Sequence, residues 1–214
     1  MKDKKNKIVC IIQARLNSKR LPKKVIMDIG GKNCVERVIE RVKKSKLIDE
    51  IWLATTYLKI DRSLKKICET NKIHYFQGSI SNVLSRFYKI SKITNAKYIV
   101  RITADCPLVD WEIIDDMIKE IKIKKYDYFS NTIQRTFPDG LDIEIFSSST
   151  LKKTYLNAKH PFLKEHVTPY MHGKVSGSIE TGSFNVKQFL YKTDYSNYRI
   201  TLDRKEDLNL IKEI

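Results

Sequence analysis

The stretch "KIVCIIQARLNSKRLPKK" (residues 7–24) joins an apolar run to a strongly cationic loop. Residues 7–14 predict a buried β-strand, because a short, continuous apolar run is typical of a strand covered on both faces. The loop after it has five positive charges and no acid to offset them: Arg15, Lys19, Arg20, Lys23 and Lys24. This cluster at the end of a strand indicates either a binding surface for a polyanion or a basic turn in solvent.

Strand and helix patterns alternate along the chain up to residue 131. Apolar runs predict strands at 7–14, 50–56, 73–76, 97–103 and 126–131. Apolar residues at helical spacing predict helices at 33–47, 62–71, 81–93 and 110–122, the last of them capped by Asp110. Strands that alternate with helices of about 10–15 residues indicate βαβ units, so we expect an α/β fold with a doubly wound, mostly parallel sheet.

The pattern changes after residue 131. The sequence predicts strands at 141–146 and 198–203, a helix at 162–173 interrupted by Pro169, hairpin or loop structure at 176–186, and a closing helix at 204–214. We therefore expect one domain, residues 1–214, in which an inserted β-rich segment of about 132–197 covers one end of the sheet. This segment is the expected place for acceptor binding or for contact between subunits.

The chain is basic, with a net charge of +16 from 41 Lys and Arg against 25 Asp and Glu. Its first 46 residues hold 15 of the basic residues and only 4 of the acidic ones. This excess favours negatively charged partners, such as nucleic acid, an anionic membrane or a polyphosphate. A surface rich in lysine throughout would explain the total charge equally well, but it would not explain the local cluster after the first strand.

Other global features indicate a cytoplasmic protein without membrane association. No apolar run approaches the ~20 residues that span a bilayer. The charged stretch 1–7 is followed by too few apolar residues for the core of a signal peptide. The four cysteines lie singly in or beside apolar runs, which indicates reduced, buried thiols and neither a disulfide framework nor a zinc site: Cys10, Cys34, Cys68 and Cys106.

Charged residues follow three of the predicted strands. The cationic loop follows the first, Asp105 follows the strand at 97–103, and Asp203 ends the strand at 198–203. Ligands of open α/β sheets bind outside the carboxyl ends of the strands. Because cations neutralise phosphate charge and carboxylates hold Mg²⁺, these residues together predict a site for a polyphosphate with a divalent metal.

Each of these carboxylates also has a purely structural alternative. Asp105 could form a turn before Pro107, and Asp203 could cap the last helix, since "DRKE" (203–206) has the spacing of a capping box. Neither GxxxxGK[ST] nor GxGxxG occurs, so the polyphosphate site is not predicted to be a P-loop or a dinucleotide fingerprint.

A second group of candidates lies in "DGLDIEIF" (139–146) and in the helix after it. Asp142 and Glu144 are two residues apart on a predicted strand, so both face one way and Ile143 faces the other. Two acids on one face could bind sugar hydroxyls or an amino group, act as a base, or form an exposed strand face. His166 could help bind a carboxylate or phosphate group or be an ordinary surface histidine.

Six blocks of this chain resemble the signature of the cytidylyltransferase family, which includes CMP-acylneuraminate and CMP-ketodeoxyoctonate synthetases. The resemblance is closest to the branch named for spore coat polysaccharide biosynthesis. In chain order the blocks are "IIQARLNSKRLPKKVIMDIGGK" (11–32), "NVLSRF" (82–87), "RITADCPLVD" (101–110), "FPDGLDIEIF" (137–146), "EHVTPY" (165–170) and "ITLDRKEDL" (200–208). They run along nearly the whole chain, and together they are far more specific than any single block.

The resemblance implies a nucleotide-diphosphosugar-transferase-like α/β fold and the transfer of CMP from CTP, with Mg²⁺, to a small acceptor such as a sugar acid for surface polysaccharide synthesis. It implies a possible homodimer and no nucleic-acid partner. The implied residues are Arg15 and Lys24 on the triphosphate, Gln13 and Ala14 at the cytosine and ribose, Arg86 on the nucleotide side or in a structural role, and Asp105 and Asp203 on the metal. The sequence departs from the family pattern at Lys23, where glycine is usual, and removes no implied ligand.

Two other classes of function remain as alternatives. A glycosyltransferase that uses an NDP-sugar could share this sheet, but such enzymes usually need an acid-x-acid pair after a central strand, and "TADCP" (103–107) has one acid. A basic nucleic-acid-binding protein would have exposed aromatic residues among its cations and a steep salt dependence. Here the charge is concentrated in one loop, which favours the polyphosphate site.

Overall fold

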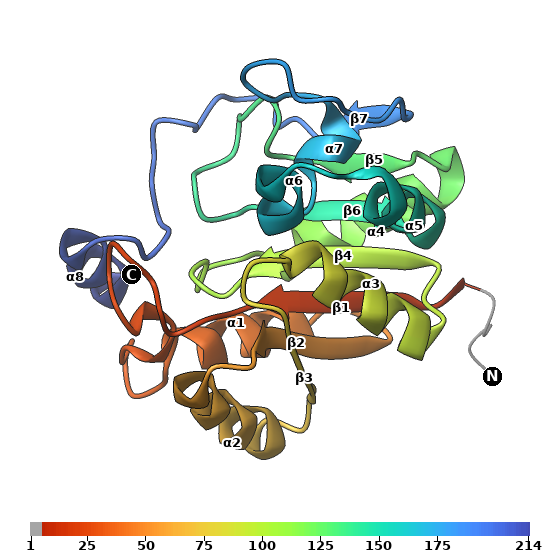
Figure 1. Cartoon of the computed structure of the whole chain (residues 1–214). Helices are drawn as coiled ribbons and strands as arrows, with labels where there is room; N and C mark the ends of the chain where they lie inside the picture. The colour runs from red at the N-terminus through yellow and green to blue at the C-terminus, as the bar shows by residue number, and fades with distance from the viewer. Residues whose placement is uncertain (1–5) are drawn as a thin grey trace.

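The computed structural model, which describes residues 6–214, is built on a seven-stranded sheet. Its strands lie in the order β3-β2-β1-β4-β6-β5-β7 (Figure 1). Their bounds are β1 (Ile8–Gln13), β2 (Glu50–Thr56), β3 (His74–Gly78), β4 (Tyr98–Thr103), β5 (Tyr128–Ser130), β6 (Glu144–Ser147) and β7 (Val186–Gln188). The first five strands therefore lie where the sequence predicts them, within about two residues at either end.

The sheet is mostly parallel. β1 pairs in parallel with β2 on one side and with β4 on the other, and β2 pairs in parallel with β3. β6 runs antiparallel between β4 and β5, and β7 extends the edge parallel to β5. Because Gln13 at the end of β1 lies opposite Thr103 at the end of β4, the loops that leave these two central strands begin side by side.

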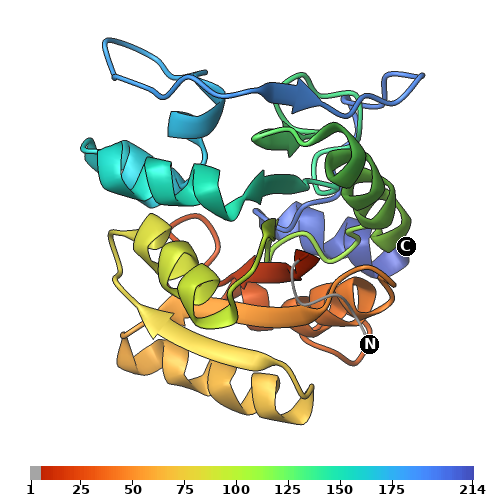
Figure 2. The ribbon, with the colours of Figure 1, turned by 90° about the vertical axis from the view of Figure 1, so that its right-hand side faces the viewer.

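Helices cover both faces of the sheet, as the doubly wound prediction requires (Figure 2). In β1, Cys10 and Ile12 point into one core, and Val9 and Ile11 point into the other. The first core packs against α1 (Cys34–Lys43), α2 (Ser63–Thr70) and α4 (Trp111–Lys124). The second packs against α3 (Val83–Thr94), α5 (Ser148–Asn157), α6 (Pro161–His166) and α7 (Pro169–His172).

The helix boundaries follow local chemistry. Asp110 caps α4 as predicted, because its carboxylate accepts a hydrogen bond of 2.7 Å from the backbone N–H of Glu112. The predicted break near Pro169 separates α6 from α7, and Val167 between them has a positive φ of 71°. The chain closes with α8 (Lys205–Glu213), and short 3-10 turns lie at Lys24–Ile26 and Lys59–Arg62.

Residues 132–197 add two strands to the sheet, β6 between β4 and β5 and β7 at the edge, and they also form three helices. The sequence did not indicate α5. Its buried side chains are Leu151 and two threonines, so it lacks the apolar stripe by which an amphipathic helix is recognised. Its hydroxyl-rich start is capped by Ser147, whose side chain accepts a hydrogen bond from the N–H of Thr150.

The strand predicted at 198–203 is wrong. This segment forms only an isolated bridge between Arg199 and Asp139. The N–H of Ile200 donates to the carbonyl of Asp139, and the N–H of Leu202 donates to the carbonyl of Asp105. Because its successive N–H groups bond to two separate loops, the segment does not extend the sheet, although it is extended and partly buried.

Two global predictions can be compared with the structure. All four cysteines are free and buried, and burial raises the pKa of the Cys34 and Cys68 thiols to about 12. Within the described residues, no helix has the length and apolar character needed to cross a membrane. The charged N-terminal stretch considered for a signal peptide begins in residues 1–5, which lie outside the described part of the chain.

Candidate active site

A cavity of about 450 Å³ opens at the carboxyl ends of β1 and β4. It brings together every residue that the sequence placed on the nucleotide side. The residues that line it are Gln13, Ala14, Arg15, Ser18, Lys19, Arg20, Lys24, Val25, Val83, Arg86, Thr103, Ala104, Asp105, Glu165 and His166. The cationic loop after β1 is therefore one wall of a cavity, whose opposite wall follows β4, and it is not an isolated surface turn.

Lys24 connects the two acids predicted to bind metal. Its ammonium lies 2.5 Å from Oδ2 of Asp105 and 2.6 Å from Oδ1 of Asp203. The other carboxylate oxygen of Asp203 lies 2.9 Å from the guanidinium of Arg20. Lys24 is 8% exposed, so three charges from distant parts of the sequence meet in one largely buried cluster.

Burial and charge act in opposite directions on the pKa values of this cluster. Burial alone would lower the pKa of Lys24, but the adjacent Asp105 and Asp203 outweigh it and raise the pKa. Burial alone would raise the pKa of Asp105, but the charge and hydrogen bond of Lys24 hold it below its usual value. Both groups are therefore charged near neutral pH.

Asp203 does not cap the last helix, so its structural alternative is wrong. The N-cap residue of α8 is Arg204, and Asp207 in the first turn of the helix accepts hydrogen bonds of 2.7 Å, through its Oδ2, from the backbone N–H groups of Asp203 and Arg204. The carboxylate of Asp203 is therefore free of the helix N-terminus and pairs with Lys24 and Arg20 of the cavity. Its place beside Asp105 is fixed by the backbone, because the carbonyl of Asp105 accepts hydrogen bonds from the N–H of Leu202 and from Oγ1 of Thr201.

Two further arginines line the cavity in very different environments. Arg15 is exposed and lies 3.7 Å from Glu165. Arg86 is 1% exposed, donates to the carbonyl of Ala54 at 3.2 Å, and has a buried Nε without a hydrogen-bond partner. Burial, together with the charge of Arg15, lowers the pKa of Arg86 to about 10. A buried guanidinium with a spare donor is costly unless a ligand completes its hydrogen bonds.

A second cavity of about 360 Å³ adjoins the first and contains the predicted acceptor residues. Thr103 and His166 line both cavities. The second cavity is lined by Arg101, Thr103, Thr132, Asp142, Glu144, Phe162, His166, Thr168, Pro169, His172 and Lys174. Asp142 and Glu144 thus face one space as predicted, while Ile143 is buried in the core on the other side.

The two acids of the second cavity are already paired with arginines. Asp142 accepts two hydrogen bonds from Arg135, at 2.5 and 3.0 Å. Glu144 pairs with Arg101 and accepts a hydrogen bond of 2.6 Å from the hydroxyl of Tyr128. Neither acid is therefore a bare carboxylate available as a strong base, and together with their arginines they form a hydrogen-bonding wall.

The histidines of the second cavity are neutral near pH 7. Burial and the cations Arg101 and Arg15 lower the pKa of His166, although the neighbouring Glu165 opposes the shift. Burial lowers the pKa of His172 to about 4, and its Nδ1 accepts a hydrogen bond from the N–H of Lys174.

Among the charged and titratable residues of these cavities, sequence reasoning did not identify Arg20, Arg101 and His172 as site residues, nor Arg135, which does not line a cavity but pairs with Asp142. Arg20 belongs to the cationic loop, and Arg101 opens the block "RITADCPLVD". Arg20 and Arg101 could thus have been identified as site residues by their position in a block that matches the family signature. Their partners lie 183 and 43 residues away along the chain, at Asp203 and Glu144, so the sequence did not show which acid each arginine would meet.

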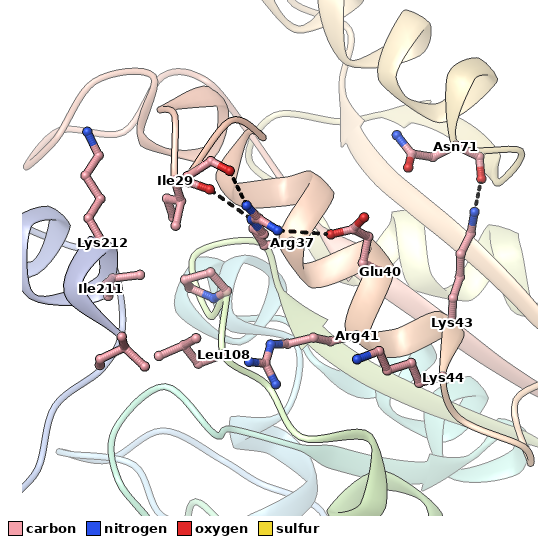
Figure 3. A pocket seen from close by; sticks show the side chains of 13 residues that line it. Ile29, Arg37, Glu40, Arg41, Lys43, Lys44, Asn71, Leu108, Ile211 and Lys212 are labelled. Carbon is pink, nitrogen blue, oxygen red and sulfur yellow. Dashed lines mark hydrogen bonds and ion pairs between the residues drawn. The ribbon is translucent and has the colours of Figure 1, made fainter.

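A cavity of about 720 Å³, larger than either cavity of the candidate site, lies beside α1 and α8 (Figure 3). Several of its charged groups are satisfied within the chain. Arg37 donates to the carbonyls of Ile29 and Gly30 and pairs with Glu40, and Lys43 donates to the carbonyl of Asn71 (Figure 3). Arg37 therefore anchors the end of the loop that contains Lys24 to α1.

The fold and the cluster of Lys24, Asp105 and Asp203 indicate the class of protein. A mostly parallel α/β sheet with a cationic loop and two acids at its carboxyl edge is a nucleotidyltransferase-like arrangement. Comparison with known proteins then gives the family. The family model described as "Cytidylyltransferase" matches residues 9–214. The chain belongs to the cytidylyltransferase family, and it is a nucleotidyltransferase.

Individual relatives agree with this assignment. The chain is 31% identical over 217 residues to the spore coat polysaccharide biosynthesis protein SpsF of Bacillus subtilis, covering 98% of this chain and 86% of that protein. It is 25% identical over 213 residues to a 3-deoxy-manno-octulosonate cytidylyltransferase of Rickettsia prowazekii, covering 98% and 83%. A cytidylyltransferase structure from Leptospira borgpetersenii superposes with a TM-score of 0.90 at 33% identity, covering 97% of this chain and 85% of that one. The resemblance and the fold class predicted from the sequence are thereby confirmed.

Proposed function

We propose that this enzyme transfers CMP from CTP to a sugar acid or a related phosphorylated metabolite and releases pyrophosphate, for the synthesis of a surface polysaccharide. The observation that supports this most is that the cationic loop and Asp105 line one cavity, and that Lys24 of this loop pairs with both Asp105 and Asp203, in a chain of the cytidylyltransferase family. The functions in the names of the two relatives, polysaccharide biosynthesis and cytidylyl transfer to 3-deoxy-manno-octulosonate, support the product and the acceptor class.

The nucleotide occupies the first cavity in this proposal. Arg15 and Lys24 contact the triphosphate, because charge-assisted hydrogen bonds from Arg and Lys to phosphate are among the strongest in proteins. Gln13 and Ala14 lie where the cytosine and ribose bind, at the end of β1. Arg86 completes its hydrogen bonds on the nucleotide, which explains why a buried guanidinium faces this cavity with a spare donor.

The residues present fit a magnesium ion. One carboxylate oxygen of Asp105 and one of Asp203 converge on the same point, since both lie within 2.6 Å of a single nitrogen atom. Oxygen ligands from one or two carboxylates are what Mg²⁺ prefers in proteins. Asp105 and Asp203 would hold this ion, and when bound it would neutralise negative charge on the phosphate oxygens.

The acceptor occupies the second cavity. Its hydroxyl attacks the α-phosphorus of CTP in line, the new O–P bond forms, pyrophosphate leaves with the bonding electrons, and the proton of the hydroxyl is released to water. The chain positions both reactants across the boundary formed by Thr103 and His166. Arg15 and Lys24 stabilise the charge that develops on the leaving pyrophosphate. Asp142, Glu144 and His166 orient the acceptor through hydrogen bonds.

A pyrophosphate-release assay tests this function. The enzyme is incubated with each of the four NTPs and Mg²⁺, with and without a panel of sugar acids that includes 3-deoxy-manno-octulosonate. The expected result is release that needs both CTP and one class of acceptor. Release with another NTP, or transfer of a sugar from an NDP-sugar in a parallel assay, would replace this proposal with a different donor or with the glycosyltransferase alternative.

A further inference from the structure

Lys24 lies at the point where the metal-binding acids converge. Its ammonium is within 2.6 Å of both Asp105 and Asp203. Within residues 6–214, no other Lys or Arg lies within ion-pair distance of Asp105, whereas Asp203 also pairs with Arg20 and Arg199. A divalent cation that uses these two carboxylates must therefore compete with Lys24, and Asp105 depends on Lys24 for its charge balance.

The backbone holds the two acids together whether or not Lys24 is present. The carbonyl of Asp105 accepts hydrogen bonds from the N–H of Leu202 at 2.8 Å and from Oγ1 of Thr201 at 3.1 Å. The N–H of Asp203 is held in turn by Asp207. Loss of the lysine charge would thus leave two like charges that cannot move far apart, which is the arrangement that binds a divalent cation well.

The loop that contains Lys24 is fixed at both ends, so its side chain is the part that can respond to a ligand. The N–H of Lys23 donates to the carbonyl of Leu16, and the N–H of Met27 donates to the carbonyl of Lys24. Farther along the chain, Arg37 holds the carbonyls of Ile29 and Gly30 against α1 (Figure 3). A long, flexible ammonium side chain on a fixed backbone can exchange one anionic partner for another.

We propose, on the basis of the function proposed above, that Lys24 acts as an internal substitute for the metal and sets the order of binding. In the chain alone it occupies Asp105 and Asp203 and keeps divalent cations from binding there. The triphosphate of the nucleotide offers its ammonium a second set of anionic oxygens and draws it away, which frees both acids for the metal. Metal and nucleotide then bind with positive coupling, because each weakens the contact that opposes the other.

Binding of Mn²⁺ in the absence of nucleotide tests this inference. Mn²⁺ is the probe because its electron paramagnetic resonance signal and its effect on water-proton relaxation report free and bound ions. Lys24→Met removes the ammonium and keeps the length of the side chain. Lys23→Met is the matched control, since it removes one charge from the neighbouring exposed residue. Lys24→Met/Asp105→Asn tests whether any new site uses Asp105.

The expected result is one Mn²⁺ site in Lys24→Met that binds at least tenfold more tightly than any site of the wild type. The control should bind as the wild type does, and the double variant should lose the new site. Equal affinity in Lys24→Met and the wild type would overturn the inference. Circular dichroism checks folding, and Lys24→Gln, which keeps an amide donor, replaces the methionine variant if that variant does not fold.

This titration contains neither nucleotide nor acceptor, so its outcome is independent of the pyrophosphate assay. A negative Mn²⁺ result together with CTP-dependent pyrophosphate release rejects the role of Lys24 and keeps the proposed function. A positive Mn²⁺ result without any release keeps the competition between Lys24 and the metal and rejects CMP transfer.

Discussion

The two adjoining cavities are built from charges in different ways. In the first cavity, the proposed nucleotide cavity, Lys24 pairs with two acids, and Arg15 and Arg20 add further positive charge. In the second, the proposed acceptor cavity, each acid has its own arginine, Asp142 with Arg135 and Glu144 with Arg101. Positive charge therefore exceeds negative charge in the first cavity, which suits a ligand of high negative charge. In the second cavity the positive and negative charges nearly balance, and its hydrogen-bonding surface suits a hydroxyl-rich molecule.

Because of this difference, we expect the charged residues of the two cavities to contribute differently to activity and to stability. Charges that are shared among several partners can be transferred to a ligand, so their removal should affect activity more than stability. Charges that are matched one to one stabilise each other, and removal of one from a buried pair such as Arg101 and Glu144 leaves its partner without compensation. Three predictions test this contrast, beginning with the largest expected effect.

Asp105→Asn should lower turnover with CTP and acceptor by about a thousandfold, because the amide keeps the shape of the side chain but removes the negative charge that we propose to hold the metal. Steady-state kinetics of pyrophosphate release measures the effect, and circular dichroism should show an unchanged fold. Asp116→Asn is the matched control on the exposed face of α4, where the acid pairs with Lys119, and it should retain full activity. Near-normal turnover in Asp105→Asn contradicts the assignment of Asp105.

Arg101→Met should lower the free energy of unfolding by about 3–5 kcal/mol, because it leaves the carboxylate of Glu144 buried without its cation. The side chains of this pair are only 14% and 8% exposed. Urea denaturation measures the loss. Lys119→Met, which breaks an exposed pair on α4, should change the free energy of unfolding far less, because exposed ion pairs contribute little. A loss for Arg101→Met as small as that of the control would show that the acceptor cavity does not depend on matched charges.

His172 should make the fold less stable as the pH falls from about 6.5 toward 4. Its folded-state pKa of about 4 lies below the ordinary value of 6.5, so the unfolded chain binds the proton first and stability is lost across this interval. Allowing for partial exposure, the effect between pH 7 and pH 5 is about 1 kcal/mol.

The His172→Gln variant tests the contribution of this histidine. Denaturation curves at pH 7 and pH 5 should show a smaller difference for His172→Gln than for the wild type. A histidine signal that titrates near pH 6.5 in NMR spectra of the folded protein, if assigned to His172, would contradict the prediction.

The contrast between the cavities also explains how much the sequence alone could predict. β1, β4 and the loops after them were predictable because apolar runs mark buried strands, and because parallel strands bring their carboxyl ends to one edge. The gathering of the cationic loop, Asp105 and Asp203 was predicted from that rule, although the strand assumed before Asp203 does not form. The matched blocks singled out Arg15, Lys24 and Arg86.

The remaining features depend on contacts that no local pattern encodes. The pairing of Arg101 with Glu144 follows from the antiparallel register of β4 and β6, which a prediction of separate strands does not contain. The segment at 198–203 has the composition of a strand but bonds to two loops. α5 is covered by its neighbours with few apolar side chains of its own, so its periodicity was too weak to detect.

The product of the reaction tests the central claim most directly. The enzyme is incubated with CTP, Mg²⁺ and the acceptor found in the pyrophosphate assay, and the products are identified by mass spectrometry and ³¹P NMR. The account predicts a phosphodiester of CMP and the acceptor, formed in a one-to-one ratio with pyrophosphate. A product that contains no CMP, or one formed equally well from UTP, GTP or ATP, would contradict it.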